Sequence, residues 1–195
     1  MDIHTRDNEN MKSTMTSGLR IENVLFSKHK KQIKEIYIDS FPKEERMPFG
    51  MMIFMTCFIT TKFFAYYDGD TLCGFIYMAK IGRQIFILFF AVDEKLRSKG
   101  YGAKILGEIR ARYPKCNIVV SIEHCGEDAP ELELRQRRKG FYMRNGYSDS
   151  GYNIKLAGVE QELLVSGGEF NKVRFTLFLL GYSCLAIIPK IWKRT

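Results

Sequence analysis

The chain has 195 residues, of which 46% are hydrophobic and 27% are charged, and its formal net charge is +8. This length and composition are typical of a globular protein with one full core, and they leave little room for a second domain. The positive charge favours an anionic partner such as nucleic acid, a membrane surface or a phosphorylated cofactor, although a basic surface alone explains it equally well.

The N-terminal segment, residues 1–19, is polar and lacks the apolar core of a signal peptide. We expect a disordered leader there, a folded domain over 20–174 and an apolar helix over 175–195 that docks on this domain. Two apolar stretches, 49–61 and 175–189, are shorter than the about 20 residues of a spanning helix. The sequence therefore predicts a cytoplasmic protein without stable membrane insertion, with a membrane-associated tail as the alternative for 175–189.

The cysteines and histidines do not form a metal-binding pattern. No C-x-x-C pair is present, and the five cysteines are odd in number. Buried, reduced thiols are the expected state, and no metal site is expected, because His4, His29 and His124 do not cluster in the sequence.

Alternating and periodic apolar residues predict the elements in chain order. The expected strands are 21–26, 63–68, 71–82, 84–92, 117–123, 153–156 and 162–166, and the expected helices are 28–41, 51–61, 100–113 and 131–145. Gly69-Asp70 predicts a hairpin, and the continuous apolar run 84–92 predicts a strand buried on both faces. This order predicts a mixed α/β (α+β) single domain with a mostly antiparallel sheet and helices on both faces.

One short segment, Arg97-Ser98-Lys99-Gly100-Tyr101-Gly102, lies where an apolar strand passes into a helix. Glycines at such a turn leave backbone N–H groups uncovered at the helix start, and the helix dipole makes that start suited to phosphates. Neither a P-loop nor a three-glycine dinucleotide fingerprint is present. By itself, the pattern is also compatible with a tight turn that binds nothing.

A second motif accompanies this turn. The pattern Arg97-x-x-Gly100-x-Gly102-Ala103, followed by Phe141-Tyr142-x-x-x-Gly146-Tyr147, resembles the GNAT superfamily of N-acetyltransferases. The resemblance extends from Ile21 to Ser166, and it implies a GNAT-like fold with acetyl-CoA as cosubstrate and no metal.

The resemblance also implies how the coenzyme is held. The pyrophosphate is expected at a turn made of Arg97, Ser98, Lys99, Gly100, Tyr101, Gly102 and Ala103. The backbone of Phe90, Ala91 and Val92 is expected to pair with the pantetheine arm. The N–H of Val92 is the implied donor to the thioester oxygen, and Tyr142 the implied proton donor to the departing thiolate; otherwise Tyr142 would be interpreted as a core residue.

The base that deprotonates the amine is less well specified by the sequence. Glu123 ends the buried strand 117–123, where a raised pKa is expected, and ranks first. Glu45, in a loop where the family builds its acceptor site, ranks second, and water alone is a third option. Arg135 replaces the asparagine that many members use to contact the coenzyme; it is a candidate contact to a phosphate or carbonyl, or part of an exposed basic face.

The sequence thus favours an acetyl-CoA-dependent N-acetyltransferase acting on a primary amine of a small molecule or peptide. Acidic residues at Glu44, Glu45, Glu127 and Asp128 favour a cationic acceptor. A coenzyme-A-binding regulatory protein is the first alternative. A nucleic-acid-binding protein is the second, but the basic runs 28–34 and 135–139 lack interleaved aromatics. A homodimer through 175–189 is left open.

Overall fold

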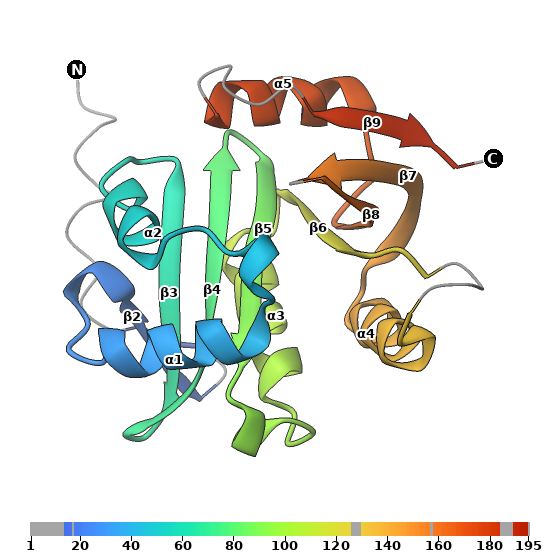
Figure 1. The fold of residues 1–195 in the computed structure, drawn as a ribbon. Helices are drawn as coiled ribbons and strands as arrows, with labels where there is room; N and C mark the ends of the chain where they lie inside the picture. The colour runs from blue at the N-terminus through green and yellow to red at the C-terminus, as the bar shows by residue number, and fades with distance from the viewer. Residues whose placement is uncertain (1–13, 17, 126–129, 157, 184–188, 195) are drawn as a thin grey trace, which may run out of the picture. The chain divides into compact units, whose positions relative to one another are not determined.

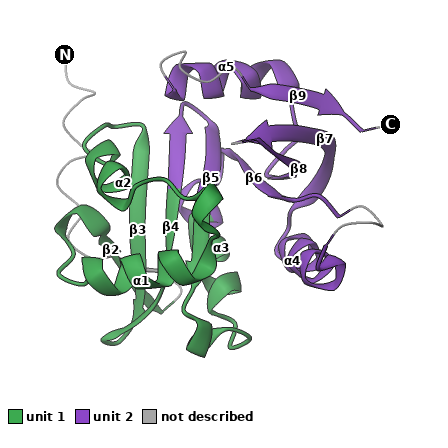
Figure 2. Cartoon of the chain, viewed as in Figure 1, with its two compact units in different colours: residues 1–77, 89–109 green, residues 78–88, 110–195 purple. Residues whose placement is uncertain are grey.

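The protein is described by a computed structural model over residues 14–16, 18–125, 130–156, 158–183 and 189–194. It contains two compact units (Figure 2). Unit 1 comprises Met1–Tyr77 and Phe89–Ile109, and unit 2 comprises Met78–Leu88 and Arg110–Thr195. Two strands, β4 (Thr71–Ile81) and β5 (Gln84–Val92), contribute residues to both units.

Unit 1 combines strands at its centre with three helices. Besides its parts of β4 and β5, it contains β1 (Thr14–Thr16), β2 (Leu19–Asn23), α1 (Lys30–Ser40), α2 (Phe49–Met55), β3 (Thr61–Asp68) and most of α3 (Tyr101–Arg112), with short 3-10 helices at Val24–Phe26, Lys43–Glu45 and Glu94–Leu96. Its strands follow the order β1-β2-β3-β4-β5. The β1–β2 and β2–β3 pairs are antiparallel, with Ile21 opposite Tyr66.

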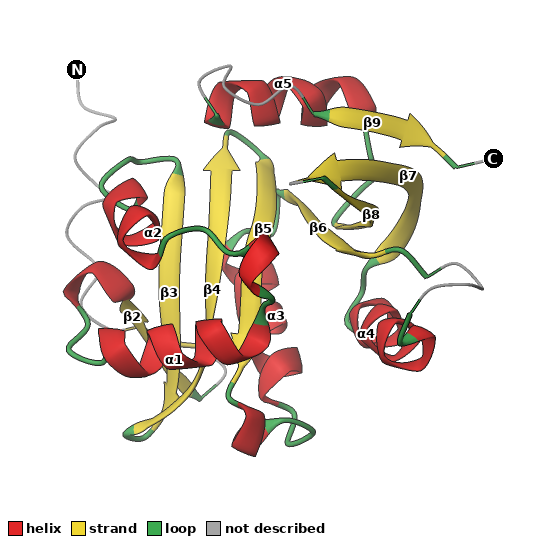
Figure 3. Ribbon diagram, viewed as in Figure 1, coloured by secondary structure: helices red, strands yellow, loops and turns green. Residues whose placement is uncertain are grey.

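Helices cover both faces of the unit 1 strands (Figure 3). Phe63 of β3 packs against Phe49 of α2, with the ring centroids 5.9 Å apart. Tyr66 points to the opposite face, because side chains alternate along a strand. There its hydroxyl donates a hydrogen bond to Glu108 of α3 at 3.0 Å. The α1–α2 layer and α3 therefore enclose the sheet between them.

Unit 2 continues from β4 and β5 into a second set of strands (Figure 1). Its further elements are β6 (Asn117–Glu123), α4 (Leu132–Arg144), β7 (Ser148–Leu156), β8 (Val159–Ser166), α5 (Lys172–Tyr182) and β9 (Lys190–Lys193). The strand order is β4-β5-β6-β8-β7-β9. The β5–β6 pair is parallel, with Gln84 opposite Asn117, and the β6–β8, β7–β8 and β7–β9 pairs are antiparallel.

The core of unit 2 lies beneath α5. Buried side chains of this helix (Phe175, Phe178 and Leu179) pack with buried side chains of the strands (Ala79, Phe86, Val119, Ile154, Leu163, Val165 and Ile191). Glu162 precedes Leu163 on β8 and therefore points to the other face, where it binds Lys139 of α4. Helices α4 and α5 thus cover opposite faces, and the predicted mixed, mostly antiparallel α/β fold is confirmed.

Most of the predicted elements are confirmed, with shifted ends. The strand over 117–123 matches β6, whereas the helix expected over 51–61 is the shorter α2. The strand expected over 21–26 gives way to a 3-10 helix at Val24–Phe26. The Asn23 side chain caps the start of this 3-10 helix, because it accepts a hydrogen bond from the Leu25 N–H at 2.9 Å.

The two ends of the chain differ from the expectation. Thr14–Thr16 form β1 on β2, so the prediction of a disordered leader is wrong for these residues. Residues 1–13 lie outside the described part. At the other end α5 starts earlier than expected and β9 was not foreseen, while 184–188 also lie outside the described residues. The division into leader, domain and docked helix stays a prediction.

Two further expectations can be compared with the described residues. Cys73 and Cys116 are buried free thiols, whereas Cys57 is exposed and Cys125 half-buried; Cys184 is not described. Within the part of the chain that the structure covers, every helix is too short or too polar to cross a membrane.

Replacing Phe175 by alanine tests the packing of α5. The ring is 1% exposed and lies 5.3 Å from that of Phe86, centroid to centroid. Its removal is expected to lower the free energy of unfolding by about 3–5 kcal/mol, measured by denaturant unfolding. The control is Leu177→Ala on the same helix, where the side chain is 63% exposed; a change above about 0.5 kcal/mol is not expected there. Equal effects of the two substitutions would contradict the described packing.

Candidate active site

The glycine turn lies in unit 1, between β5 and α3. Asp93 follows β5, and its side chain accepts a hydrogen bond from the Lys95 N–H at 2.9 Å, which starts the 3-10 helix at Glu94–Leu96. The backbone then turns sharply, with φ of 64° at Ser98 and 85° at Gly100. Glycine adopts such a positive φ without the steric penalty that other residues incur. The second glycine of the motif, Gly102, lies inside the first turn of α3.

The start of α3 presents several hydrogen-bond donors together. The Lys104 N–H donates to the Gly100 carbonyl at 3.1 Å. The N–H groups of Tyr101, Gly102 and Ala103 precede this first intrahelical bond, so the helix itself gives them no acceptor. Arg97 and Lys99 are exposed beside them. Backbone donors at a helix N-terminus together with two cations are the donor set that a pyrophosphate requires, so these residues fit the coenzyme's phosphates.

The side chain of Tyr101 holds this turn in place. Its hydroxyl donates a hydrogen bond to Asp68 Oδ2 at the end of β3, at 2.7 Å. The same hydrogen bond raises the pKa of Tyr101. Lys104 lies over the ring, with its Nζ 5.4 Å from the centroid. Tyr101 therefore contributes its backbone N–H to the donor set, while its side chain anchors α3 to the sheet.

The end of β5 lies close to β4 at one glycine. A Cβ atom on Gly74 would overlap the Ala91 carbonyl oxygen and would lie 3.0 Å from the Val92 Cα, so only glycine fits there without a backbone shift. Just beyond the strand, the Asp93 N–H donates to the Cys73 carbonyl at 2.9 Å. The segment Phe90–Val92, expected to hold the pantetheine arm, is thereby fixed against β4 and continuous with the turn.

The loop that carries Glu45 is anchored by a buried tyrosine. The Tyr37 hydroxyl accepts a hydrogen bond from the Met47 N–H at 2.8 Å and donates one to the Met47 carbonyl at 3.2 Å. Burial raises the pKa of Tyr37 to about 12, against the opposing effects of Met47 and Arg46. Glu45 is half-buried in the 3-10 helix of this loop, and Glu44 is exposed.

Glu123 differs from the expectation. It ends β6 as predicted, but its carboxylate accepts a hydrogen bond from the Arg138 guanidinium of α4. Burial alone would raise the pKa of Glu123, yet Arg138 and the charge of Arg135 outweigh burial and lower it. The prediction of a raised pKa for Glu123 is therefore wrong. The sequence could not show this, because no local pattern indicates that Arg138 reaches this carboxylate. A carboxylate held in this ion pair is a poor base.

Tyr142 lies on α4 with its side chain 6% exposed. Its ring lies 5.3 Å from those of Phe141 and Tyr147, centroid to centroid. Burial raises the pKa of Tyr142, opposed by Arg138 and reinforced by Glu123. The phenol consequently stays protonated at neutral pH. It is a hydrogen-bond donor that lies near the Glu123–Arg138 ion pair.

Arg135 is engaged within its own unit. Its guanidinium donates a hydrogen bond to the His124 carbonyl at 2.8 Å, which ties α4 to the end of β6. The structure thus gathers Glu123, Arg135 and Tyr142 in unit 2, around Arg138. The turn, Phe90–Val92 and Glu45 belong to unit 1. Across the described residues, no group of histidine, cysteine and acidic side chains is arranged to hold a metal ion.

A charged cluster that the sequence motifs do not reveal fixes α4. Glu162 of β8, whose side chain is 3% exposed, lies 2.7 Å from Lys139 Nζ and 2.6 Å from Arg194 Nη1. Lys139 also lies 2.9 Å from Asp149, which Arg194 binds as well. A further hydrogen bond reaches Glu162 from the Cys125 N–H at 2.9 Å. These residues are far apart in the sequence, so no local motif could have shown the cluster.

One family model matches a central part of the chain. The family model described as an acetyltransferase (GNAT) domain matches residues 60–149, which include β3, the turn, α3 and Tyr142. Residues 60–149 are therefore similar to the GNAT acetyltransferase domain, which is the resemblance that the sequence motifs predict. No curated protein sequence matches the chain significantly.

Solved structures share the fold over most of the chain. A protein from Bacteroides thetaiotaomicron described as belonging to the GNAT family is 24% identical over 82% of this chain and 93% of its own, with a TM-score of 0.66. An aminoglycoside 6'-N-acetyltransferase complexed with coenzyme A is 16% identical over 75% and 95%, with a TM-score of 0.59. A Bacillus subtilis acetyltransferase in complex with CoA is 15% identical over 76% and 97%, with a TM-score of 0.54.

The charged cluster makes a pH-dependent prediction. Burial raises the pKa of Glu162, but Lys139, the Cys125 N–H and Arg194 outweigh it, so the folded pKa lies below the ordinary 4.5. The folded protein then binds this proton less readily than the unfolded chain does. The stabilisation is therefore present above the ordinary pKa and is lost as the pH falls through the folded one.

Glu162→Gln is accordingly expected to lower the free energy of unfolding by about 2 kcal/mol at neutral pH. The free energy of unfolding of this variant should also fall less steeply than that of the wild type as the pH is lowered from about 6 to about 3. Urea unfolding across this range measures both effects. The control is Glu169→Gln at an exposed glutamate. An unchanged acid decline in Glu162→Gln would exclude the cluster as its source.

Proposed function

We propose that the protein is an N-acetyltransferase that transfers the acetyl group of acetyl-CoA to a primary amine. Acetyl-CoA supplies the activated acyl group as a thioester. The observation that carries the proposal is the donor set at the start of α3, formed by the N–H groups of Tyr101, Gly102 and Ala103 with Arg97 and Lys99. It lies within the span that the GNAT family model matches.

The proposal assigns the coenzyme to residues along β5 and the turn. The segment Arg97–Ala103 holds the pyrophosphate, and the backbone of Phe90–Val92 pairs with the pantetheine arm. Ser98 and Gly100 shape the turn through their positive φ. Arg135, already bound to the His124 carbonyl, has donors left for a further contact because a guanidinium carries five N–H groups.

Transfer to an amine requires a donor to the oxygen that becomes negative, a donor to the departing thiolate and an acceptor for the amine proton. We assign the first role to the Val92 N–H. Tyr142 takes the second: its buried phenol stays protonated and lies near the Glu123–Arg138 pair. Because Glu123 is held by Arg138, its role is to position α4, and amine deprotonation is left to Glu45 or water.

The amine class follows from two considerations. Glu44 and Glu45 lie together in the 3-10 helix of the α1–α2 loop, and paired carboxylates favour a cationic acceptor. One structural neighbour is an N-acetyltransferase of aminoglycosides, which are polyamines. Glu127 and Asp128, which also favoured a cationic acceptor in the sequence, lie outside the described residues.

The proposal is tested by thiol release. Purified protein is incubated with acetyl-CoA and a panel of a diamine, a lysine peptide and an aminoglycoside, and free coenzyme A is measured with a thiol reagent. Release that depends on an amine, with a mass increase of one acetyl group on that amine, supports the proposal. Tight coenzyme binding without transfer to any amine would favour the regulatory alternative.

Gly102→Val tests the coenzyme site. A branched side chain in the first turn of α3 is expected to cover the N–H donors and weaken acetyl-CoA binding at least about tenfold. Gly107→Val is the matched control, because Gly107 lies on the same helix and a Cβ atom there would meet nothing within 4 Å. Both variants replace a glycine of α3 by valine, so the change in intrinsic helix propensity is of the same kind. Calorimetric titration measures the affinity; equal weakening in both variants would show that the loss does not come from covering the N–H donors.

Tyr142→Phe tests the donor to the thiolate. Acetyl-CoA affinity is expected to stay within about twofold, while kcat falls about a hundredfold, the usual effect of losing a general acid. Tyr147→Phe is the control, since Tyr147 is the neighbouring buried tyrosine, and burial raises its pKa too. Comparable kcat values for wild type and Tyr142→Phe would remove Tyr142 from the chemistry.

A further inference from the structure

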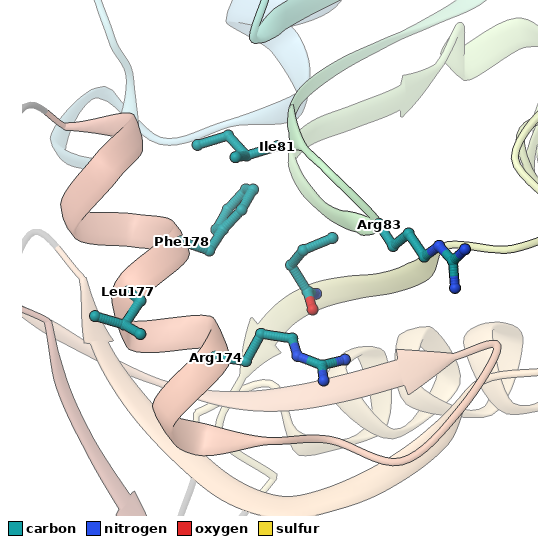
Figure 4. A pocket seen from close by; sticks show the side chains of 6 residues that line it. Ile81, Arg83, Arg174, Leu177 and Phe178 are labelled. Carbon is teal, nitrogen blue, oxygen red and sulfur yellow. The ribbon is translucent and has the colours of Figure 1, made fainter.

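A hollow of about 430 Å³ lies in unit 2, where the turn between β4 and β5 faces α5 (Figure 4). The β-hairpin contributes Ile81, Arg83 and Gln84 to its lining, and α5 contributes Arg174, Leu177 and Phe178. Its volume is within the range of small-molecule sites. Gln84 is the first residue of β5, whereas Val92, which the proposed transfer uses, is the last. This is a separate site.

The lining is divided into an apolar and a cationic part. Figure 4 shows Ile81 and Phe178 near one another, with the guanidinium groups of Arg83 and Arg174 extending away from them. Phe178 is 5% exposed, so its side chain is held by the packing around it. Leu177 is 63% exposed and adds accessible apolar surface to the lining of the hollow. Gln84 also lines the hollow, and its amide donates a hydrogen bond to the Asn117 carbonyl at 3.3 Å.

The two arginines differ from the cations that fix α4 in this unit. Arg138, Lys139 and Arg194 each lie within ion-pair distance of a carboxylate. For Arg83 and Arg174, the described residues provide no such carboxylate. No carboxylate of the described residues therefore balances these two exposed guanidinium groups at the hollow, and a guanidinium binds carboxylate and phosphate oxygens in a bidentate manner.

From this division we propose that the hollow binds an amphiphilic anion: a carboxylate or phosphate head at Arg83 and Arg174, with an acyl chain against Ile81, Leu177 and Phe178. The same head-and-chain chemistry occurs in a free fatty acid and in an anionic lipid. A purely polar anion would leave the apolar side chains of the lining exposed to water. A neutral apolar ligand would form no ion pair with Arg83 or Arg174. An amphiphilic anion satisfies both parts of the lining.

The first experiment titrates the full-length protein with acetate, hexanoate and decanoate by calorimetry. Affinity is expected to rise by roughly fourfold for each methylene that leaves water, and to fall with added salt. Neutral decanol and cationic decyltrimethylammonium are expected to bind at least about tenfold more weakly than decanoate. Vesicles of phosphatidylglycerol, compared with phosphatidylcholine, form the second arm and distinguish a lipid source from a free one.

Variants identify the site. Arg83→Gln/Arg174→Gln is expected to weaken decanoate binding at least about tenfold. Its control is Lys115→Gln/Lys172→Gln, which removes two exposed charges outside the lining and is expected to bind decanoate as the wild type does. Leu177→Ser should reduce the gain per methylene. Far-UV circular dichroism and thermal unfolding show whether each variant is folded.

The two arms have distinct outcomes. Binding of monomeric decanoate that depends on the arginine pair supports a free amphiphile, and arginine-dependent binding to phosphatidylglycerol vesicles alone supports a lipid. If neither ligand binds, or if the arginine and lysine double variants bind equally, the proposed site is overturned.

Discussion

The backbone conformation at residues 97–100 is the constraint on which the proposed chemistry depends. Positive φ values at Ser98 and Gly100 turn the chain out of β5 and into α3, so that two exposed cations directly precede the three N–H groups at the start of α3. The Tyr101–Asp68 hydrogen bond and the close approach of Gly74 to Ala91 then fix this turn to the sheet. Because these donors are already held in position before the ligand binds, no binding free energy is lost in ordering them.

A second constraint acts on α4 through charge. Glu162 and Asp149 face Lys139 and Arg194, so two negative and two positive groups balance in a partly buried cluster. Removal of one member leaves an uncompensated charge, which costs more than the pair contributes. Arg194 comes from the end of the chain, and its N–H also donates to the Gly151 carbonyl at 2.8 Å. The last described residues therefore help to fix the helix that carries Tyr142 and Arg138.

The sequence predicted those parts of the fold and site that depend on residues close together in the chain. The apolar runs of β5 and β6 and the glycines of the turn are visible without knowledge of their partners. The rest depends on contacts between distant residues. Thr14–Thr16 form a strand only because β2 lies beside them, and the expected base Glu123 loses its raised pKa to Arg138, a residue 15 positions away. The arginine hollow combines a hairpin turn with a helix about 90 residues later, and neither segment suggests a site alone.

The central claim is that the turn at the start of α3 is a coenzyme site, and it is tested most directly by calorimetric titration of the purified protein with acetyl-CoA. Free coenzyme A and ATP serve as comparisons, because all three ligands carry phosphates. The account predicts saturable one-to-one binding of acetyl-CoA and coenzyme A, with ATP at least about tenfold weaker because it lacks the pantetheine arm that pairs with Phe90–Val92. Absence of acetyl-CoA binding at low salt, or equal binding of ATP, would contradict it.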